Sequence, residues 1–312
     1  MKTAIVFPGQ GSQKLKMGQE LFNSYAEARQ VFEEVSDSLN FKISEIIFGE
    51  DDSLLKKTEN TQVCLMAVSV AITRVFEKKL GKKIKDIANV LAGHSLGEYS
   101  ALCISGAISL KSAAIILRKR GEFMASCMPS GGAMLAVIGL SEEKLEEVIL
   151  KAKENEILVI ANDNSNGQIV LSGNENAILR AEKHAKEMGA KMAIKLEVSG
   201  PFHSPLLQNA SEKMVQALNE ISIQMPEIPV INNVNVEEYS SVSEIREILA
   251  KQVVSKVRWR ETMLKMEADG IKTAIELGSG KVLSGLFKRT CKEIQCFSAE
   301  TESEIENIIK IL

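Results

Sequence analysis

The sequence predicts an α/β fold made of a large domain with a mainly parallel sheet and an inserted, small ferredoxin-like subdomain. Three observations predict this class. Short apolar runs alternate with helical patterns towards both ends of the chain, a β-α-β-β-α-β order fills its middle, and a serine between two glycines joins a strand to a helix. With 312 residues, of which 45% are hydrophobic, the chain can bury one large core with an insertion.

The elements of the large domain are visible in the spacing of apolar residues. Short apolar runs typical of buried strands occupy 3–7, 88–92, 229–231 and 272–276. Segments with helical periodicity occupy 61–79, 109–126, 205–219 and 259–268. Because strands and helices alternate along the chain, we expect the sheet to be mainly parallel.

A different unit follows the turn residues Pro129-Ser130-Gly131-Gly132. Its expected elements are a strand over 133–138, a helix over 141–151, strands near 157–161 and 168–172, a helix over 174–188 and a strand over 191–196. This order is typical of a ferredoxin-like fold. We therefore expect a large α/β domain over 1–128 and 198–312 and a ferredoxin-like subdomain over 129–197, with a site in the cleft between them.

The serine motif is Gly93-His94-Ser95-Leu96-Gly97, which lies between the apolar 89–92 segment and a helix-forming segment that begins at Glu98. In hydrolase-like sheets, such a serine lies on a sharp turn from strand to helix, which exposes its hydroxyl and leaves the first N–H groups of the helix free for an oxyanion. The two glycines allow the chain to pass close to itself. The motif predicts Ser95 as a nucleophile in a hydrolase-like domain.

A serine nucleophile needs a base, usually a histidine, and the chain has three histidines. His94 lies in the serine motif with its side chain pointing away from that of Ser95, so it is most simply a packed turn residue. His184 lies on the polar side of the 174–188 helix and is most simply solvated. His203 follows a strand end and a Gly-Pro loop, which holds side chains rigidly beside a cleft. We therefore predict His203 as the general base.

A second glycine loop, Pro8-Gly9-Gln10-Gly11-Ser12-Gln13, follows the 3–7 strand. A dinucleotide-binding fingerprint would need a third glycine where Lys14 stands, and no Lys-Ser/Thr phosphate pair follows. At the carboxyl end of a strand, beside the serine turn, this loop could instead supply a backbone N–H to an oxyanion hole.

The 109–126 helix carries a short basic run, Arg118-Lys119-Arg120. The apolar stripe of this helix consists of Leu110, Ala114, Leu117 and Met124. Helical spacing puts Arg120 at the edge of that stripe and the other two residues farther round. A solvated basic face is the ordinary interpretation. An arginine directed towards a core edge, however, needs an anion, and a substrate carboxylate would satisfy its planar fork with two hydrogen bonds.

Taken together, these motifs resemble those of the malonyl-CoA:acyl-carrier-protein transacylases of fatty-acid synthesis. The resemblance runs in order from residue 3 to about residue 297. The matching motifs are Phe7-Pro8-Gly9-Gln10-Gly11-Ser12-Gln13, Gly93-His94-Ser95-Leu96-Gly97-Glu98-Tyr99, Arg120-Gly121, Gly200-Pro201-Phe202-His203-Ser204 and Gly280-Lys281-Val282-Leu283. One loop departs from the family, which commonly has Gly-Pro-Gly where this chain has Gly278-Ser279-Gly280. That loop is structural, so the departure leaves the chemistry intact.

The resemblance implies a ping-pong reaction with two thiols. Ser95 takes the malonyl group from malonyl-CoA, and the phosphopantetheine thiol of an acyl carrier protein then removes it. By the same resemblance, His203 is the base and is oriented by a backbone carbonyl near Gln252, so no triad carboxylate is expected. The backbone N–H groups of Gln10 and Leu96 form the oxyanion hole.

The resemblance also implies how the acyl group is chosen. Arg120 pairs with the malonyl carboxylate, and Asn162 matches a polar position of the site. Phe202 matches a residue that narrows malonyl-specific sites, which predicts poor use of methylmalonyl groups; simple packing is its alternative role. No metal and no cofactor are expected, because the coenzyme A thioester is a substrate.

Composition limits the partners and the location of the protein. A net charge of −3 and a pI of about 5.9, without a basic domain, argue against nucleic acid as a partner. The five cysteines lack C-x-x-C spacing and neighbouring histidines, which indicates reduced thiols and argues against structural zinc. No stretch approaches the roughly 18 apolar residues of a membrane span, and the first apolar run is too short for a signal peptide. We expect a cytoplasmic monomer that binds no membrane.

Other functions share part of this pattern. A serine thioesterase or acyl hydrolase would share the serine turn, but an α/β-hydrolase has its histidine near the C-terminus and this chain has none after His203. A Ser-Asp dyad could recruit Asp269, although that residue equally fits a turn after a helix. A non-catalytic carrier-binding module would need neither Ser95 nor a base. An acyltransferase of a polyketide pathway also stays open, because the sequence does not distinguish carrier proteins.

Docking of an acidic carrier protein requires a local basic patch, because the chain as a whole carries a net charge of −3. Alternation in Lys191-Met192-Ala193-Ile194-Lys195-Leu196 puts the methionine, the isoleucine and the leucine on one face of a strand and both lysines on the other. We expect Lys191 and Lys195 on the exposed face, where they could help to dock the carrier, although a solvated sheet face is the alternative. Lys281, Lys288 and Arg289 are the next candidates.

Overall fold

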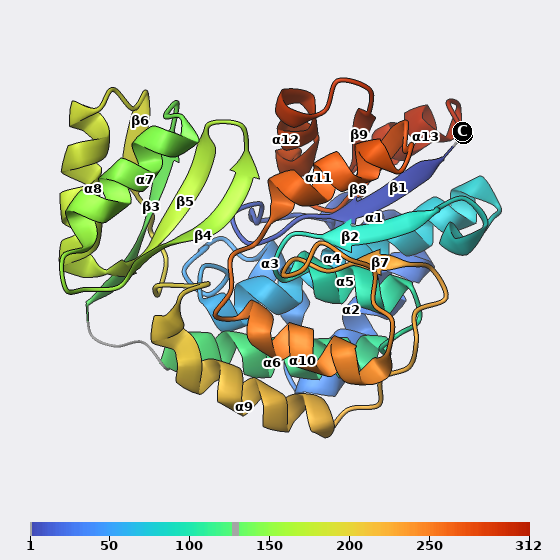
Figure 1. Cartoon of the computed structure of the whole chain (residues 1–312). Helices are drawn as coiled ribbons and strands as arrows, with labels where there is room; N and C mark the ends of the chain where they lie inside the picture. Colours follow the sequence, from blue (N-terminus) through green and yellow to red (C-terminus); the bar gives the residue numbers. More distant parts are fainter. Residues whose placement is uncertain (1, 127–130) are drawn as a thin grey trace.

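The large domain is built on a five-stranded parallel sheet (Figure 1). The structure is a computed structural model that describes residues 2–126 and 131–312. The strands are β1 (Thr3–Phe7), β2 (Val90–Gly93), β7 (Val230–Ile231), β8 (Thr273–Leu277) and β9 (Gln295–Ala299). Their order is β7-β2-β1-β8-β9, and every neighbouring pair is parallel. The predicted parallel sheet is confirmed, and β9 is a strand that the apolar pattern did not predict.

Helices cover both faces of this sheet, because alternate side chains of each buried strand point to opposite sides. Ile5 and Phe7 of β1 belong to the larger core, which also contains residues of α2 (Ala26–Leu39), α4 (Thr58–Leu80), α5 (Gly97–Ile104) and α6 (Leu110–Ser126). Ala4 and Val6 pack on the other face against α11 (Trp259–Ala268) and α12 (Val282–Thr290). Figure 1 shows these two helices above the sheet and the larger group below it.

The remaining helices complete the larger core. They are α1 (Gln19–Ser24), α3 (Ile43–Phe48), α9 (Gln208–Asn219), α10 (Val242–Gln252) and α13 (Glu302–Ile309), with short 3-10 helices at Ile84–Asp86 and Pro205–Leu207. The expected 205–219 helix is thus a 3-10 turn followed by α9. Helix α4 is buried along its whole middle, from Asn60 to Thr73. In the described ranges, no helix combines the length and the apolar character that crossing a membrane requires.

The smaller sheet is antiparallel and has the strand order β4-β5-β3-β6. Its strands are β3 (Gly132–Ile138), β4 (Leu158–Ser165), β5 (Gln168–Asn174) and β6 (Met192–Lys195), and α7 (Glu142–Lys153) and α8 (Glu175–Glu187) cover one face. The predicted ferredoxin-like order is confirmed. Pro129 and Ser130 of the expected linker lie outside the described residues, and the boundaries 1–128, 129–197 and 198–312 stay predictions.

Strand β4 fastens the small sheet to the large domain. It continues to Ser165, beyond the expected end at residue 161, and its outer edge forms a parallel bridge with residue 257, just before α11. The Asp163 N–H donates to the Val257 carbonyl at 3.0 Å, and the Asp163 carboxylate pairs with Arg260 at 2.9 Å. Residues 162–165, which lie beyond the expected end of this strand, are therefore held in β4 beside the large domain.

The expectation for β6 is confirmed only in part: Lys191 and Lys195 are exposed, but the face with Met192 and Ile194 is not the buried one. Met192 and Ile194 are 44% and 50% exposed, and Ala193 between them is buried in the core under α7 and α8. The Lys195 ammonium pairs with Glu175 at the start of α8, so this lysine lies on the helix-covered side of the sheet. The reason is that a small alanine suffices where the helices lie close to an edge strand, which leaves the large apolar side chains on the opposite, open face.

Candidate active site

The turn at Ser95 has the geometry of a nucleophile elbow. Strand β2 ends at Gly93, Ser95 has a φ of 53°, and α5 begins at Gly97. A Cβ added to Gly93 would lie 1.9 Å from the Gly97 carbonyl carbon, and one added to Gly97 would lie 2.3 Å from the Phe7 oxygen. Only glycine fits at both positions, so the backbone conformation that presents the serine depends on them.

The Ser95 hydroxyl and the His203 imidazole are in hydrogen-bond contact. Ser95 Oγ lies 2.8 Å from His203 Nε2, and His203 Nδ1 lies 2.9 Å from the backbone oxygen of Gln252. A carbonyl oxygen only accepts hydrogen bonds, so Nδ1 carries the proton and Nε2 presents a lone pair to the serine. This tautomer can remove the hydroxyl proton.

The electrostatics of the site keep His203 neutral. Burial, and after it the positive charge of Arg120, lower the pKa of His203 to about 3. The hydrogen bond to the Gln252 carbonyl acts in the opposite direction. An imidazole that is neutral at physiological pH is free to act as a base, and a negative charge placed beside Arg120 would strengthen it.

Backbone N–H groups of two loops lie beside the serine. The His94 N–H donates to the Phe7 carbonyl at 3.0 Å, and Gly9 packs so closely that an added Cβ would lie 2.6 Å from the His94 oxygen. These contacts hold the loop after β1 against the elbow, and Gln10 and Leu96 both line the same cavity as Ser95. In the described parts of the chain, neither the Gln10 nor the Leu96 N–H has an acceptor, so both can bind an oxyanion.

Arg120 is buried and directed at the Ser95 hydroxyl. Its Nη1 donates to Gln62 Oε1 at 2.6 Å, and its Nη2 donates to Gln252 Oε1 at 2.8 Å and to Ser95 Oγ at 3.1 Å. Its Nε is buried and has no partner among the described residues. All three acceptors are neutral, so the guanidinium has free donor capacity for a carboxylate. Arg118 on the same helix instead pairs with Glu122 at the surface.

The cavity above Ser95 is small and partly apolar. It has a volume of about 140 Å³, and its wall is formed by loops and helices of the large domain together with strands of the small sheet. Its apolar lining comes mainly from Met124, Met134, Val170, Leu196, Val198 and Phe202. Asn162 is buried in the same wall. All eight predicted site residues thus lie around one point, although Gln252 contributes through its contacts with His203 and Arg120 and does not line the cavity.

The other candidate residues take no part in the Ser95–His203 contact, although His94 lines the same cavity. The His94 ring is buried with its Nε2 2.7 Å from Asn164 Oδ1 and is tilted by 57° against the Trp259 ring, as expected for a packed turn residue. His184 lies beside Glu187 on α8. Asp269 follows α11 and pairs with Lys265, at the end of the sheet where β8 begins, whereas Ser95 lies at the opposite, carboxyl end of the strands. A Ser95-Asp269 dyad is therefore excluded.

Sequence reasoning missed the polar residues behind the elbow. Asn233 Oδ1 accepts from the Ser95 N–H at 2.7 Å, and its Nδ2 donates to the Gly93 carbonyl at 2.8 Å. Gln62 holds Arg120, and Glu98 accepts from both Gln252 and the Asn233 backbone. Of these, Glu98 carried a sequence signal: it lies three residues after Ser95 and is the one charged residue of the segment 97–104.

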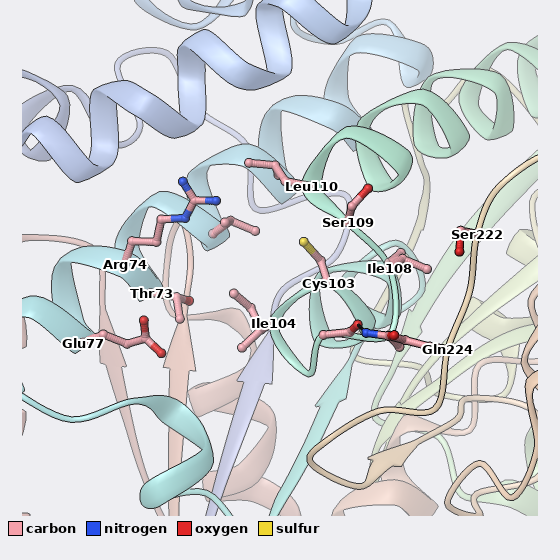
Figure 2. A pocket seen from close by; sticks show the side chains of 13 residues that line it. Thr73, Arg74, Glu77, Cys103, Ile104, Ile108, Ser109, Leu110, Ser222 and Gln224 are labelled. Atoms are coloured by element: carbon pink, nitrogen blue, oxygen red, sulfur yellow. Dashed lines mark hydrogen bonds between the residues drawn. The ribbon is translucent and has the colours of Figure 1, made fainter.

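A larger hollow lies at the opposite end of α5 and holds none of the predicted site residues (Figure 2). Its volume is about 440 Å³, and Figure 2 shows Thr73, Arg74 and Glu77 of α4 facing Cys103 and Ile104 of α5 across it. Burial raises the pKa of the Cys103 thiol to about 12, so this thiol stays protonated and unreactive. Size alone therefore does not identify the active site.

The sequence and the fold are similar to those of known acyltransferases. Residues 4–307 match the family model described as an acyl transferase domain. The malonyl CoA-acyl carrier protein transacylase of Bacillus subtilis is 42% identical over 313 residues, which cover 100% of this chain and 97% of that protein.

Solved structures extend this similarity to the fold. The acyl-carrier-protein S-malonyltransferase of Bartonella henselae has a TM-score of 0.96 and 44% identity, with 100% of this chain and 99% of that chain covered. A malonyl-transacylase solved in complex with a type II PKS acyl-carrier protein has a TM-score of 0.96 and 36% identity, with 100% of both chains covered.

Proposed function

Because the chain belongs to the malonyl-CoA:acyl-carrier-protein transacylases of the acyl transferase family, we propose that it transfers malonyl groups from malonyl-CoA to an acyl carrier protein for fatty-acid synthesis. The main observation behind the proposal is that the Ser95 hydroxyl contacts both His203 and Arg120. Ser95 Oγ lies 2.8 Å from a neutral imidazole and 3.1 Å from a buried guanidinium. A nucleophile with its base beside a receptor for carboxylate suits a carboxylated acyl group.

In the first half-reaction, Ser95 Oγ attacks the thioester carbon of malonyl-CoA while its proton passes to His203 Nε2. The carbonyl oxygen becomes an oxyanion, which the N–H groups of Gln10 and Leu96 stabilise. Collapse of this intermediate breaks the carbon-sulfur bond, and the departing thiolate takes the proton from His203. The products are free coenzyme A and a malonyl ester on Ser95.

In the second half-reaction, the phosphopantetheine thiol of the carrier protein takes the place of coenzyme A. His203 Nε2 accepts the thiol proton, and the sulfur attacks the ester carbonyl. The carbon-oxygen bond to Ser95 breaks, and the serine oxygen recovers the proton from His203. The same base thus serves both half-reactions in opposite directions.

The contacts of Arg120 support its role in acyl choice. Its charge is buried among neutral partners, so the malonyl carboxylate would be its first direct anionic partner among the described residues. That carboxylate would also offset the charge that lowers the pKa of His203, which strengthens the base when the correct acyl group is bound. The small cavity, with Phe202 in its wall, leaves little room for a branched acyl group.

One assay separates transfer from hydrolysis and from simple binding. The protein is incubated with radiolabelled malonyl-CoA, and label is measured on the protein, on added carrier protein and as free malonate. We expect a stable label on the wild type, rapid passage of label to the carrier and slow release to water. Ser95→Ala should abolish the covalent label, because no other described side chain occupies the position of the hydroxyl. Rapid release to water without transfer would identify a thioesterase, and labelling of Ser95→Ala at the wild-type rate would contradict the assignment of the nucleophile.

The same assay addresses the pathway. A fatty-acid carrier and a polyketide carrier are compared at equal concentration, and we expect the lower KM for the fatty-acid carrier. A lower KM for the polyketide carrier would instead favour a polyketide-pathway enzyme. The monomeric state and the cytoplasmic location stay predictions.

A further inference from the structure

A buried carboxylate lies directly behind the nucleophile and takes no part in the steps above. Glu98 is completely inaccessible to solvent, in the first turn of α5. Its Oε2 accepts from Gln252 Nε2 at 2.8 Å and from the Asn233 backbone N–H at 2.9 Å, and its Oε1 accepts from the Tyr239 hydroxyl. A carboxylate buried this deeply is costly unless its charge serves a partner.

The side-chain amide of Gln252 connects Glu98 to its charged partner, Arg120. Gln252 donates its Nε2 to Glu98 and to the Ser95 carbonyl, so its Oε1 is turned towards Arg120 Nη2. Since Glu98 Oε2 and the Ser95 carbonyl can only accept hydrogen bonds, they select this orientation of the amide. Arg120 forms no direct ion pair with a described carboxylate, and Glu98 is the acid whose charge acts on it. Glu98 and Arg120 are therefore a buried charge pair separated by Gln252.

We propose that Glu98 is a specificity-determining residue, which neutralises Arg120 through Gln252 when the acyl pocket is empty and takes up a proton from water when a carboxylated acyl group pairs with Arg120. This inference rests on the proposed function, because it requires the acyl carboxylate at Arg120. The proton exchange keeps the net charge of the dry site constant, since one negative charge enters as another is neutralised.

The electrostatic surroundings of Glu98 allow this exchange near neutral pH. Burial raises the pKa of Glu98 to about 7, against the lowering effect of Tyr239, Asn233, Gln252 and the charge of Arg120. The other titratable groups that face it are Tyr99 on α5 and, beyond Tyr239, Glu244 on α10. Burial raises the pKa values of Tyr99 and Tyr239, so neither phenol ionises near pH 7.

The sign of the pH effect follows from linkage. A negative acyl group beside Arg120 raises the pKa of Glu98, so malonyl binding is strongest below pH 7, where Glu98 is already protonated. Binding weakens as the pH rises through about 7, because Glu98 must then take up a proton. An acetyl group carries no charge, so its binding does not depend on the protonation state of Glu98. The ratio of kcat/KM for malonyl-CoA to that for acetyl-CoA therefore falls with pH. Titration of the shared coenzyme A cancels in this ratio, and His203, with a pKa of about 3, is neutral throughout the measured range.

The experiment measures this ratio from pH 6 to pH 9 for the wild type and for three variants. We expect the wild-type ratio to fall about tenfold, the effect of a one-unit pKa shift. In Glu98→Gln, which keeps the shape without the charge, the ratio should stay flat and at pH 9 equal the wild-type value at pH 6. In Tyr239→Phe, loss of a hydrogen bond that lowers the pKa of Glu98 should move the fall to higher pH. Glu276→Gln, which changes a buried carboxylate bonded to the start of α12, should behave like the wild type.

The pH profiles of the wild type and of the variants show whether Glu98 has this role. A wild-type ratio that changes less than about twofold between pH 6 and pH 9 overturns the inference, as does a Glu98→Gln ratio that falls like the wild type. If Glu98→Gln does not fold, the wild-type profile and its displacement in Tyr239→Phe decide the question. Failure of wild-type Ser95 to accept any malonyl group would overturn the proposed function itself, whereas malonyl loading with a flat ratio would overturn the role of Glu98 alone.

Discussion

Replacement of Arg120 by alanine separates recognition of the acyl carboxylate from the chemistry at Ser95. A charged hydrogen bond at a dry site contributes about 1.5–3 kcal/mol, so its loss should lower kcat/KM for malonyl-CoA by about 10- to 150-fold. Acetyl transfer makes no use of that bond. Because the charge of Arg120 is one cause of the low pKa of His203, its removal strengthens the base, and acetyl transfer should be unchanged or faster.

The variant also has a structural cost that must be measured separately. It removes the donors that satisfy Gln62 Oε1 and Gln252 Oε1, both of which belong to buried residues. Each acceptor left without a partner costs about 1–3 kcal/mol of folding free energy, so we expect a lower melting temperature. Arg118→Ala is the matched control, since Arg118 is on the same helix but pairs with Glu122 and Asn60 and does not line the cavity. It should leave both transfer rates near those of the wild type.

The assay is the steady-state rate of transfer from malonyl-CoA and from acetyl-CoA to the carrier protein, at a temperature where circular dichroism shows that the variant is folded. Loss of malonyl transfer with retained acetyl transfer is the expected result. An equal fall in both rates would refute the reasoning, because Arg120 would then support the fold or the nucleophile and would not recognise the carboxylate.

Three further changes test other parts of the site. His203→Ala should slow labelling of the nucleophile by about 10²–10⁴-fold in single-turnover experiments, and a loss below about tenfold would mean that another group is the base. Gly97→Ala should lower the free energy of unfolding, measured in urea, by about 1–3 kcal/mol, because the new Cβ meets a backbone oxygen of β1. Gly285→Ala is the control and should leave this free energy unchanged, because there is open space around Gly285. Equal effects of the two substitutions would contradict the close-approach argument. Lys191→Glu with Lys195→Glu should raise the KM for the carrier protein at low salt and leave acylation by malonyl-CoA unchanged; an unmoved KM would place carrier docking elsewhere on the surface.

Most of the fold could be predicted because it depends on short-range patterns. The apolar runs at 3–7 and 272–276 were recognisable as strands, since a buried parallel strand needs only a few consecutive apolar residues. The 259–268 helix was predicted with the bounds that the structure has. β9 was missed because only its last residue is fully buried, so it lacks the continuous apolar run of its neighbours.

The faces of β6 could not be predicted because they depend on what packs against the strand. Alternation alone places Met192 and Ile194 together, but it does not say which side the helices cover. Here the helices leave room only for Ala193, and the large side chains lie on the open side. Period-two patterns therefore fix which residues share a face, and the tertiary structure decides which face is buried.

The sequence by itself determined the fold class, the family and the local geometry of the turn at Ser95. These follow from contacts between residues close along the chain: a strand, two glycines and the start of a helix suffice to expose Ser95. Only the tertiary structure decided what surrounds that serine. His203 lies 108 residues away along the chain and Gln252 lies 157 residues away, and both reach Ser95 because α/β packing brings separate loops to the carboxyl ends of the strands. The link from Glu98 through Gln252 to Arg120 likewise appears only when α5, α6 and α10 are packed together, since no local pattern specifies which side chains share a buried charge.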